Sequence, residues 1–244
     1  MALLNRQTLR NYFKKGSSPS AEHFADLIDS TLNIVDDGID RSGENGFRIS
    51  PVGYSNKLMS FYPSLQHREP DWYISINEQE VPGLSISDAG QAPRLVLKEG
   101  GAAGIGVANP RHALEVDGTV AMKRRVGTLH EGLVPGDGKW HDIVGRLDAP
   151  SAFEVMARID GRQGSGKYAL AHAIAVNAHG GRLSFGNIRK TGAYYGSFFN
   201  RLRFRWHGEL FQYALQVRTA SHYGIDERTG EPFQIRFQVT GLLA

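Results

Sequence analysis

Residues 161–167 (GRQGSGK) match the G-x-x-x-x-G-K core of a phosphate-binding loop. A working loop of this kind has Ser or Thr after the lysine to hold Mg²⁺, and Tyr168 stands there instead. The next segment alternates large and small residues like a strand, whereas a phosphate site needs a following helix whose N-terminus receives the phosphate. We therefore expect a hairpin loop beginning at Asp160 and Gly161, and no nucleotide site.

Two other glycine-containing segments also lack the geometry of a ligand site. Residues 101–106 (GAAGIG) have the glycines of a dinucleotide fingerprint in the reverse order, and Asn109-Pro110 blocks the helix that should follow. Residues 40–44 (DRSGE) have carboxylates near a glycine, but the glycine falls at the wrong position for a calcium loop. The second segment is typical of a solvated turn.

The histidines, serines and carboxylates form no recognisable catalytic or metal-binding pattern. Nine histidines occur without an H-E-x-x-H motif, and the absence of cysteine excludes thiolate chemistry and Cys-ligated metals. Ser165 lacks the strand–turn–helix context of a nucleophile elbow. We expect no enzyme, no metal and no cofactor. One catalytic alternative stays open, a pair of carboxylates for glycoside cleavage, because a sequence does not give their separation.

The basic residues form one conspicuous row, Arg201, Arg203 and Arg205, in which charged and apolar side chains alternate. Such a row could meet a sialylated, sulfated or phosphorylated surface. A solvated strand face, or pairing with carboxylates of another subunit, is the favoured interpretation. Residues 123–125 (KRR) mark the start of the last zone of the chain and could clamp subunits or a ligand.

The composition of the chain excludes several classes of protein. The chain has 244 residues, 41% hydrophobic and 22% charged, with a formal charge of +3 from 28 basic and 25 acidic residues. This charge is too balanced to imply nucleic acid, and no run approaches the ~18 apolar residues of a membrane span. The first residues lack the apolar segment of a signal peptide. We therefore expect neither nucleic-acid binding nor membrane insertion.

The first zone, residues 1–46, has helical periodicity. Asn5 is expected to cap a short helix, and Ser18-Pro19 to begin a second one that carries Phe24, Leu27, Ile28 and Leu32 on one side. Two helices this short cannot bury enough surface alone, so their apolar stripe is expected to pack on another copy or another protein.

The second zone, residues 47–125, has a pattern of very short β-strands. Expected strands lie at residues 72–76, 84–86, 95–97, 105–107 and 114–116, separated by Gly, Pro, Asn and Asp. Strands this short suit layers that close only when several chains wrap around one axis, with glycines letting the backbones approach. An ordinary irregular β-domain is the alternative.

The third zone, residues 126–244, predicts a mainly β head: an antiparallel, jelly-roll-like sandwich of seven or eight strands. Residues 167–178 alternate large side chains with alanine, which predicts a strand crowded on both faces, although a helix competes there. The expected strands are 126–130, 140–144, 152–159, 167–178, 188–194, 201–207, 211–219 and 232–240.

Two segments resemble parts of a known family. Residues 104–110 (GIGVANP) with residues 114–120 (LEVDGTV) resemble the neck repeat of trimeric phage tail fibres and bacterial surface adhesins, where G-I-G-T-x-x-P precedes L-x-V-x-G; Val107 stands where Thr is usual. Residues 13–16 and 24–30 are similar to the helical attachment segment of such fibres. The rest is similar in plan to their terminal heads, including the mosaic adhesive trimers of predatory bacteria.

The resemblance implies a homotrimer with a helical base (1–46), an intertwined β-rich neck (47–125) and a receptor-binding head (126–244). It also implies an extracellular location, on a phage or injection-system particle or on a bacterial surface. The expected partners are the chain's own copies and a cell-surface glycan or other receptor. A purely structural fibre and a fibre-borne glycan-degrading enzyme are the alternatives.

Strand parity predicts which loops of the head meet the ligand. If successive strands alternate in direction, loops 131–139, 160–166, 195–200 and 220–231 lie at the end away from the neck. They carry charged and aromatic side chains suited to sugar recognition. The predicted ligand-binding residues are Asp137, Lys139, Arg162, Tyr195, His222, Tyr223, Asp226 and Arg228.

Overall fold

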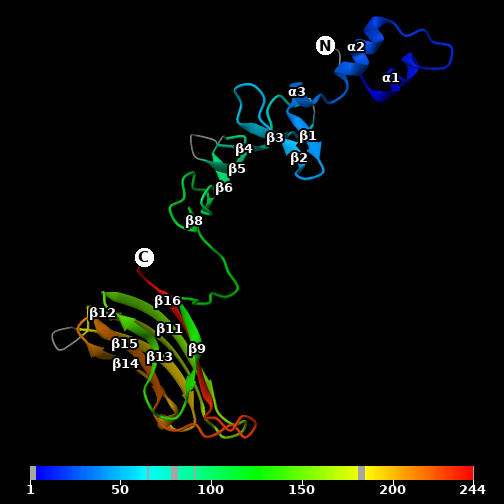
Figure 1. The fold of residues 1–244 in the computed structure, drawn as a ribbon. Helices are drawn as coiled ribbons and strands as arrows, with labels where there is room; N and C mark the ends of the chain where they lie inside the picture. Colours follow the sequence, from blue (N-terminus) through cyan, green and yellow to red (C-terminus); the bar gives the residue numbers. More distant parts are fainter. Residues whose placement is uncertain (1–3, 65, 78–81, 91, 181–184, 244) are drawn as a thin grey trace. The chain divides into compact units, whose positions relative to one another are not determined.

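The computed structural model describes residues 4–64, 66–77, 82–90, 92–180 and 185–243. The chain divides into two compact units, residues 1–121 and 122–244, and β-strands dominate both (Figure 1). The second unit begins a few residues before the predicted start of the head at residue 126.

The first unit begins with three short helices, α1 (Arg6–Tyr12), α2 (Ala21–Asp29) and α3 (Ile34–Asp37). Asn5 caps α1 as predicted, because its side chain accepts a hydrogen bond from Thr8 N at 3.0 Å. The predicted cap of α2 at Ser18 is wrong. Ser20 caps α2, since its hydroxyl accepts from His23 N while the His23 ring accepts from Ser20 N.

The helices leave their apolar side chains in contact with solvent. Phe13 meets Phe24 edge to face with ring centroids 5.5 Å apart, which joins α1 to α2. No residue of the three helices is buried, and Ile28 and Leu32 are exposed. The helices are thus too small to enclose a core.

A hairpin crosses the predicted boundary between residues 46 and 47. It consists of β1 (Ile39–Ser42) and β2 (Gly46–Ile49), paired in antiparallel register. This hairpin was not predicted, and the solvated turn expected at residues 40–44 overlaps its first strand and its connection.

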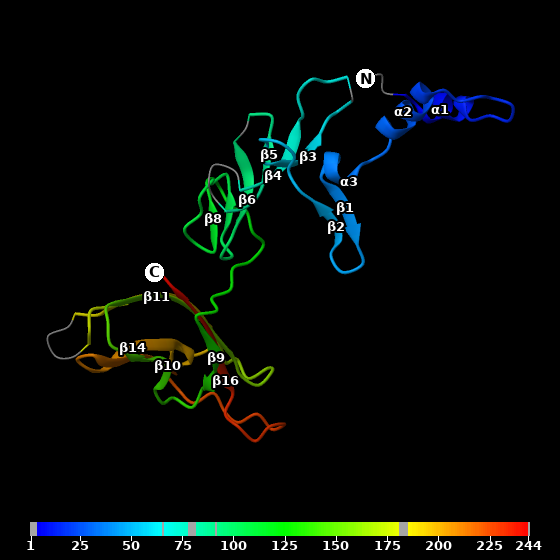
Figure 2. The same ribbon diagram turned by 45° about the horizontal axis from the view of Figure 1, so that its top comes forward.

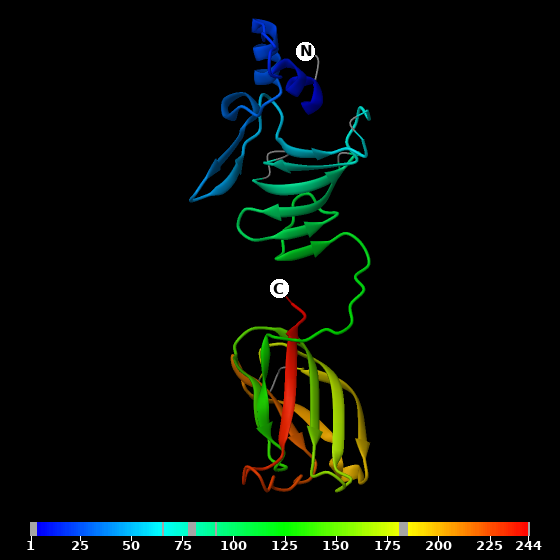
Figure 3. The ribbon, with the colours of Figure 1, turned by 90° about the vertical axis from the view of Figure 1, so that its right-hand side faces the viewer.

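Six short strands form one sheet in sequence order, which we call the neck sheet (Figure 3). All neighbours pair antiparallel except β7 and β8, which pair parallel. The five predicted strands are present with small shifts, and β3 was not predicted. The strands are β3 (Lys57–Phe61), β4 (Trp72–Ile76), β5 (Gly83–Asp88), β6 (Pro93–Lys98), β7 (Ala103–Ile105) and β8 (Leu114–Val116).

The GIGVANP segment forms the turn that leads from β7 towards β8. A side chain at Gly104 would place its Cβ 2.4 Å from the Val107 carbonyl oxygen, and Gly106 has a φ of +72°. Both glycines are thus required by contacts and backbone geometry within one chain. The structure gives them an intrachain reason in addition to the expected approach of neighbouring chains.

The described residues of the second unit form an eight-stranded antiparallel head, and seven of the eight predicted strands are present with small shifts. The predicted first strand, 126–130, is wrong, because the strand lies at residues 130–135, within the predicted loop 131–139. The strands are β9 (His130–Pro135), β10 (His141–Leu147), β11 (Ser151–Asp160), β12 (Tyr168–Asn177), β13 (Asn187–Tyr195), β14 (Leu202–Glu209), β15 (Gln212–Thr219) and β16 (Gln234–Gly241).

These strands form two sheets, β13-β12-β11-β16-β9 and β10-β15-β14, with the hydrophobic core between them (Figure 2). The first strand pairs with the last and the second with the seventh, whereas the third pairs with the fourth and the last. Val155, Leu215 and Ile235 are fully buried between the sheets. The head thus encloses its own core.

Strand β12 resolves the ambiguity between helix and strand in the alanine-rich segment. Its alanines face the core and are buried, whereas Leu170, Ile174 and Val176 lie on the outer face and are exposed. Met156 on β11 is exposed on the same face, because it pairs directly with His172. The small residues are inside and the large ones outside, which leaves an apolar patch on the head.

Candidate functional site

Four connections of the head meet at one end of the sandwich: residues 136–140, 161–167, 196–201 and 220–233 (Figure 3). We call this the loop end. The Lys167 ammonium donates to the His222 carbonyl at 2.9 Å, and the Asn200 amide donates to the Gly166 carbonyl at 3.1 Å. The connections expected from strand parity are therefore in contact with one another.

The chain enters and leaves the head at the opposite end. Leu129 N donates to the Val239 carbonyl at 3.0 Å, and Leu242 N donates to the Ala152 carbonyl at 2.9 Å. The loop end is consequently the part of the head farthest from the segment that joins it to the first unit.

Tyr223 is predicted to contact the ligand, but its side chain lies inside the head, so that prediction is wrong. The residue is 2% exposed, and its hydroxyl donates to the Asn200 carbonyl. Burial, with a smaller contribution from the charge of Asp160, raises the pKa of Tyr223. Tyr223 therefore joins two loops from within and cannot touch a surface ligand.

Asn200 is the organising residue that the sequence analysis missed. It is buried, and its amide nitrogen donates to the carbonyls of Gly166 and Tyr195, at 3.1 and 2.8 Å. With the hydrogen bond from Tyr223, it ties three of the four connections together. A lone Asn in a loop carries no sequence signal for such a role, because its partners are distant in the chain.

Asp137 is held in a fixed position rather than presented freely. Its carboxylate accepts hydrogen bonds from His141 Nε2 at 2.8 Å and from Lys139 N at 2.9 Å. Burial by itself would raise the pKa of Asp137, but these hydrogen bonds outweigh it and hold the pKa below its ordinary value. Asp137 thus stabilises the first loop by accepting hydrogen bonds from its own chain. Lys139, another predicted residue, is exposed.

The remaining predicted residues lie on the surface of the loop end. Arg162 forms an ion pair with Glu227 at 2.9 Å, and Arg228 lies 3.5 Å from the Asp226 carboxylate. Tyr195 is 68% exposed, and the His222 ring accepts from Gly224 N at 2.8 Å. Tyr195 therefore offers the largest free aromatic surface among the predicted residues.

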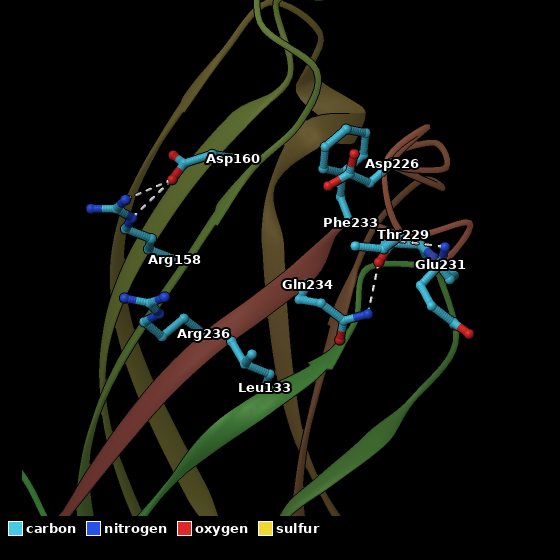
Figure 4. Close-up of a pocket in the computed structure, with 10 residues that line it drawn as sticks. Leu133, Arg158, Asp160, Asp226, Thr229, Glu231, Phe233, Gln234 and Arg236 are labelled. Atoms are coloured by element: carbon cyan, nitrogen blue, oxygen red, sulfur yellow. Dashed lines mark hydrogen bonds and ion pairs between the residues drawn. The ribbon is translucent and has the colours of Figure 1, made fainter.

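A hollow of about 390 Å³ lies beside the loop end, against the outer face of β11 and β16 (Figure 4). One wall carries Arg236 and the ion pair between Arg158 and Asp160, 2.8 Å long. The other wall is formed by the β15–β16 connection, with Asp226 and Glu231. Asp226 is the one predicted site residue in this hollow.

Two negative findings apply to the part of the chain that the structure describes. No group of three or more His, Asp or Glu side chains there could hold a metal ion. Among the same residues, no helix is long and apolar enough to cross a membrane.

The neck sheet is the second candidate site, because its two faces differ sharply. One face carries small or buried residues such as Ser75, Ser85 and Val96. The other face is what we call the apolar face. Residues in directly opposite positions of neighbouring strands point to the same face, so the strand register identifies the members of the apolar face. They are Met59, Phe61, Trp72, Ile74, Ile76, Leu84, Ile86, Leu95, Leu97, Ile105, Leu114 and Val116.

Much of the apolar face is open in the single chain. Met59, Phe61, Trp72 and Leu97 are each between 44% and 47% exposed. The expectation that this stretch cannot bury its apolar side chains alone agrees with these exposures. Sheets of this kind are covered by another layer in stable proteins.

Comparisons with known proteins supply no family. No protein-family model matches the chain, and no curated protein matches it.

Proposed function

We propose that the chain is a subunit of a homotrimeric fibre or adhesin whose head binds a cell-surface ligand, a glycan in the first instance, through its loop end. The open apolar face of the neck sheet is the observation that carries this proposal. The proposal places the protein outside the cell, on a phage or injection-system particle or on a bacterial surface.

The energetics of the apolar face favour association. Complete burial of a large apolar side chain is worth about 1.5–3 kcal/mol, so a half-exposed one has roughly 1 kcal/mol still to gain. The exposed members of the face are Met59, Phe61, Trp72, Leu84, Leu97, Ile105 and Leu114. Together they offer several kcal/mol per chain, which can offset the cost of bringing copies together.

Two further copies of this chain are the occupants that best fit the surfaces. Separate apolar surfaces remain exposed along the same chain: the stripe of α2 with Ile28, the apolar face of the neck sheet, and the patch on the head around Met156 and Ile174. Identical copies arranged around one axis cover all of these surfaces by the same operation. The resemblance of residues 104–120 to a trimeric neck repeat supports a threefold arrangement.

The loop end suits ligand binding more than catalysis. It presents an exposed tyrosine, a histidine and charged groups on loops fixed by Asn200 and Tyr223 from within. Such a surface recognises a sugar through shallow polar and aromatic contacts, which are individually weak. A trimer presents three of them, so that simultaneous engagement raises the overall affinity.

The first experiment measures the mass of the full-length chain in solution by light scattering or native mass spectrometry. One chain is 26.9 kDa, so a trimer has three times that mass, about 81 kDa. A single-chain mass at micromolar concentration would overturn the proposal.

The second experiment measures binding of the full-length chain to a glycan array and to bacterial cells. Tyr195→Ala is expected to weaken binding, and Tyr54→Ala, a fully exposed tyrosine of the first unit, serves as the matched control. An intact trimer that binds neither glycans nor cells would overturn the receptor-binding part and favour a purely structural fibre.

A further inference from the structure

Five cationic side chains gather in the head where β13 and β14 approach each other, directly beside the loop end. Lys190, Arg201, Arg203 and Arg205 line a hollow of about 470 Å³, together with Trp140, Ile188 and Phe204. Arg218 is the fifth cation and lies against Trp140. We call this group the cationic cleft.

The alternation of β14 explains why the arginines share one side. Leu202, Phe204 and Trp206 pack into the core, so Arg203 and Arg205 must face outward. The register then places Arg203 directly opposite Arg218 on β15. Like charges in directly opposite positions destabilise a sheet. Stability of the isolated head therefore does not account for this arrangement.

Neutral groups hold the cations in place. The guanidinium carbons of Arg205 and Arg218 lie 4.4 and 4.6 Å from the ring centroid of Trp140. That of Arg201 lies 3.7 Å from the Phe198 ring. The Lys190 ammonium donates to the Leu202 carbonyl at 2.9 Å. These contacts orient the side chains without neutralising their charge.

No carboxylate neutralises the cationic cleft within the described residues. Other arginines of the same head do have such partners: Arg158 with Asp160, and Arg162 with Glu227. Asp142 on β10 is linked to the cleft through Gln216, whose amide nitrogen donates to the Asp142 carboxylate at 2.7 Å and whose amide oxygen accepts from Arg205 Nε at 2.8 Å. The structure records no ion pair between Asp142 and a cation of the cleft among the described residues.

The cleft also contains donors that lack an acceptor. Nε of Arg201 and Nε of Arg218 are buried without a hydrogen-bond partner among the described residues. Burial, followed by the charges of Arg201 and Arg203, lowers the pKa of Lys190. Buried donors without partners are unfavourable, so this cluster lowers the stability of the head. An anion bound in the hollow would compensate the charge of the five cations.

We propose that the cationic cleft binds the anionic substituents, carboxylate or sulfate, of an acidic surface oligosaccharide. Guanidinium groups match both substituents, because their planar donors engage two oxygens at once. The assignment to a saccharide rests on the proposed function; the preference for an anion rests on the cleft itself. The position beside the loop end lets one extended ligand contact both surfaces.

A saccharide fits the charge distribution better than nucleic acid does. A protein that follows a phosphate backbone needs a continuous basic stripe. Here ion pairs interrupt the basic surface of the head, because Arg158, Arg162 and Arg228 each lie next to a carboxylate.

The test titrates the full-length chain with two matched pairs of probes. One pair is a sulfated heparin-derived hexasaccharide and its desulfated form, and the other is sialyllactose and lactose. We expect at least one charged member to bind tenfold or more tightly than its neutral counterpart, with affinity that falls as salt rises. The pair that shows the difference identifies sulfate or carboxylate as the substituent. Equal binding within both pairs would overturn the inference.

Single variants locate the effect. Arg203→Gln and Arg218→Gln are each expected to weaken binding of the charged probe about tenfold, the usual consequence of losing a charge-assisted hydrogen bond. Arg146→Gln removes the same charge from an exposed position on β10 and is the matched control. A loss that is equal for R203Q and R146Q would overturn the assignment to the cleft, as would tighter binding of duplex DNA or anionic vesicles than of either saccharide.

Failure of this inference and failure of the proposed function give different results. Equal binding of the parent to native cells and to cells stripped of sialic acid and sulfate would overturn the inference alone. Charge-dependent oligosaccharide binding by a chain that has the mass of one subunit would overturn the trimer alone.

Discussion

The neck sheet and the head are both built from antiparallel strands, yet only the head encloses its own core. In the head, two sheets face each other, and Val155, Leu215 and Ile235 are fully buried between them. In the neck sheet, a single layer leaves residues such as Leu97 and Ile105 nearly half exposed. The difference follows from the number of layers, because a lone sheet has nothing to place against its second face.

This contrast suggests different roles for the two regions, recognition for the head and assembly for the neck sheet. A head that is stable by itself can keep its loops in fixed positions for recognition. A neck with an open apolar face gains stability from association, which makes it a suitable assembly element. Four predictions test or sharpen this comparison.

The largest effect is expected from a charge on the apolar face. Leu97→Asp would bury an unpaired carboxylate in the proposed interface, at a cost of several kcal/mol. We expect complete loss of the trimer and a mass near the 26.9 kDa of one chain. Ser60→Asp on the opposite face of the sheet is the control and should stay trimeric. Retention of the trimer by L97D would show that the apolar face of the neck sheet is not part of the interface.

The next effect separates a core within one chain from a core shared between chains. Leu215→Ala in the head should lower the free energy of unfolding by about 2–5 kcal/mol, as deletion of a fully buried leucine does. The loss should not depend on protein concentration. Leu97→Ala should instead lower the stability of the trimer, whose unfolding midpoint depends on protein concentration because unfolding is coupled to dissociation. Urea unfolding at several concentrations distinguishes the two, and identical behaviour would contradict the comparison.

A smaller effect is expected inside the loop end. Tyr223→Phe removes the hydrogen bond to the Asn200 carbonyl and leaves that buried acceptor without this donor. The expected loss in free energy of unfolding is about 1–2 kcal/mol. Hydrogen exchange should rise in residues 196–201 and not in the neck sheet. Unchanged stability together with unchanged exchange would show that Tyr223 does not organise the loops.

The smallest effect concerns acid. The pKa of Asp137 in the folded head lies below its ordinary value of 3.8, so its ionised form favours folding. This contribution, about 1 kcal/mol or less, is complete above pH 3.8 and disappears as the pH falls through the folded pKa. Asp137→Asn should therefore be less stable than the parent near neutral pH and equal to it in strong acid. A difference in urea midpoint that persists unchanged at low pH would refute this assignment.

Regular alternation made the head predictable. The arginine row at residues 201–205 indicated a strand with one charged side, and the alanine-rich segment 167–178 indicated a strand crowded on both faces. Both are strands, but the predicted crowding of both faces is wrong for 167–178, because Leu170 and Ile174 are exposed on the outer face of β12. The strand order gave the correct clustering of the four loops, although β9 extends into the first predicted loop. The side taken by the alanines was not predictable, because either face could have been the inner one.

Prediction failed where a residue's role depended on its environment. Tyr223 has the type and loop position of a ligand-binding residue, but the loop folds it into the head. Asn200 and the partnership of Asp137 with His141 were missed for the same reason, since their contacts depend on where the loops meet. The N-terminal hairpin of β1 and β2 was also missed.

Local patterning in the sequence determined the mainly β class, the number of head strands and the loops that share one end, because side-chain period and turn residues act over a few positions. Tertiary structure alone decided which side chains are buried, which cations lack counter-ions and which sheet face stays open. Those properties depend on residues brought together from distant parts of the chain, and their energies arise from packing and desolvation in three dimensions.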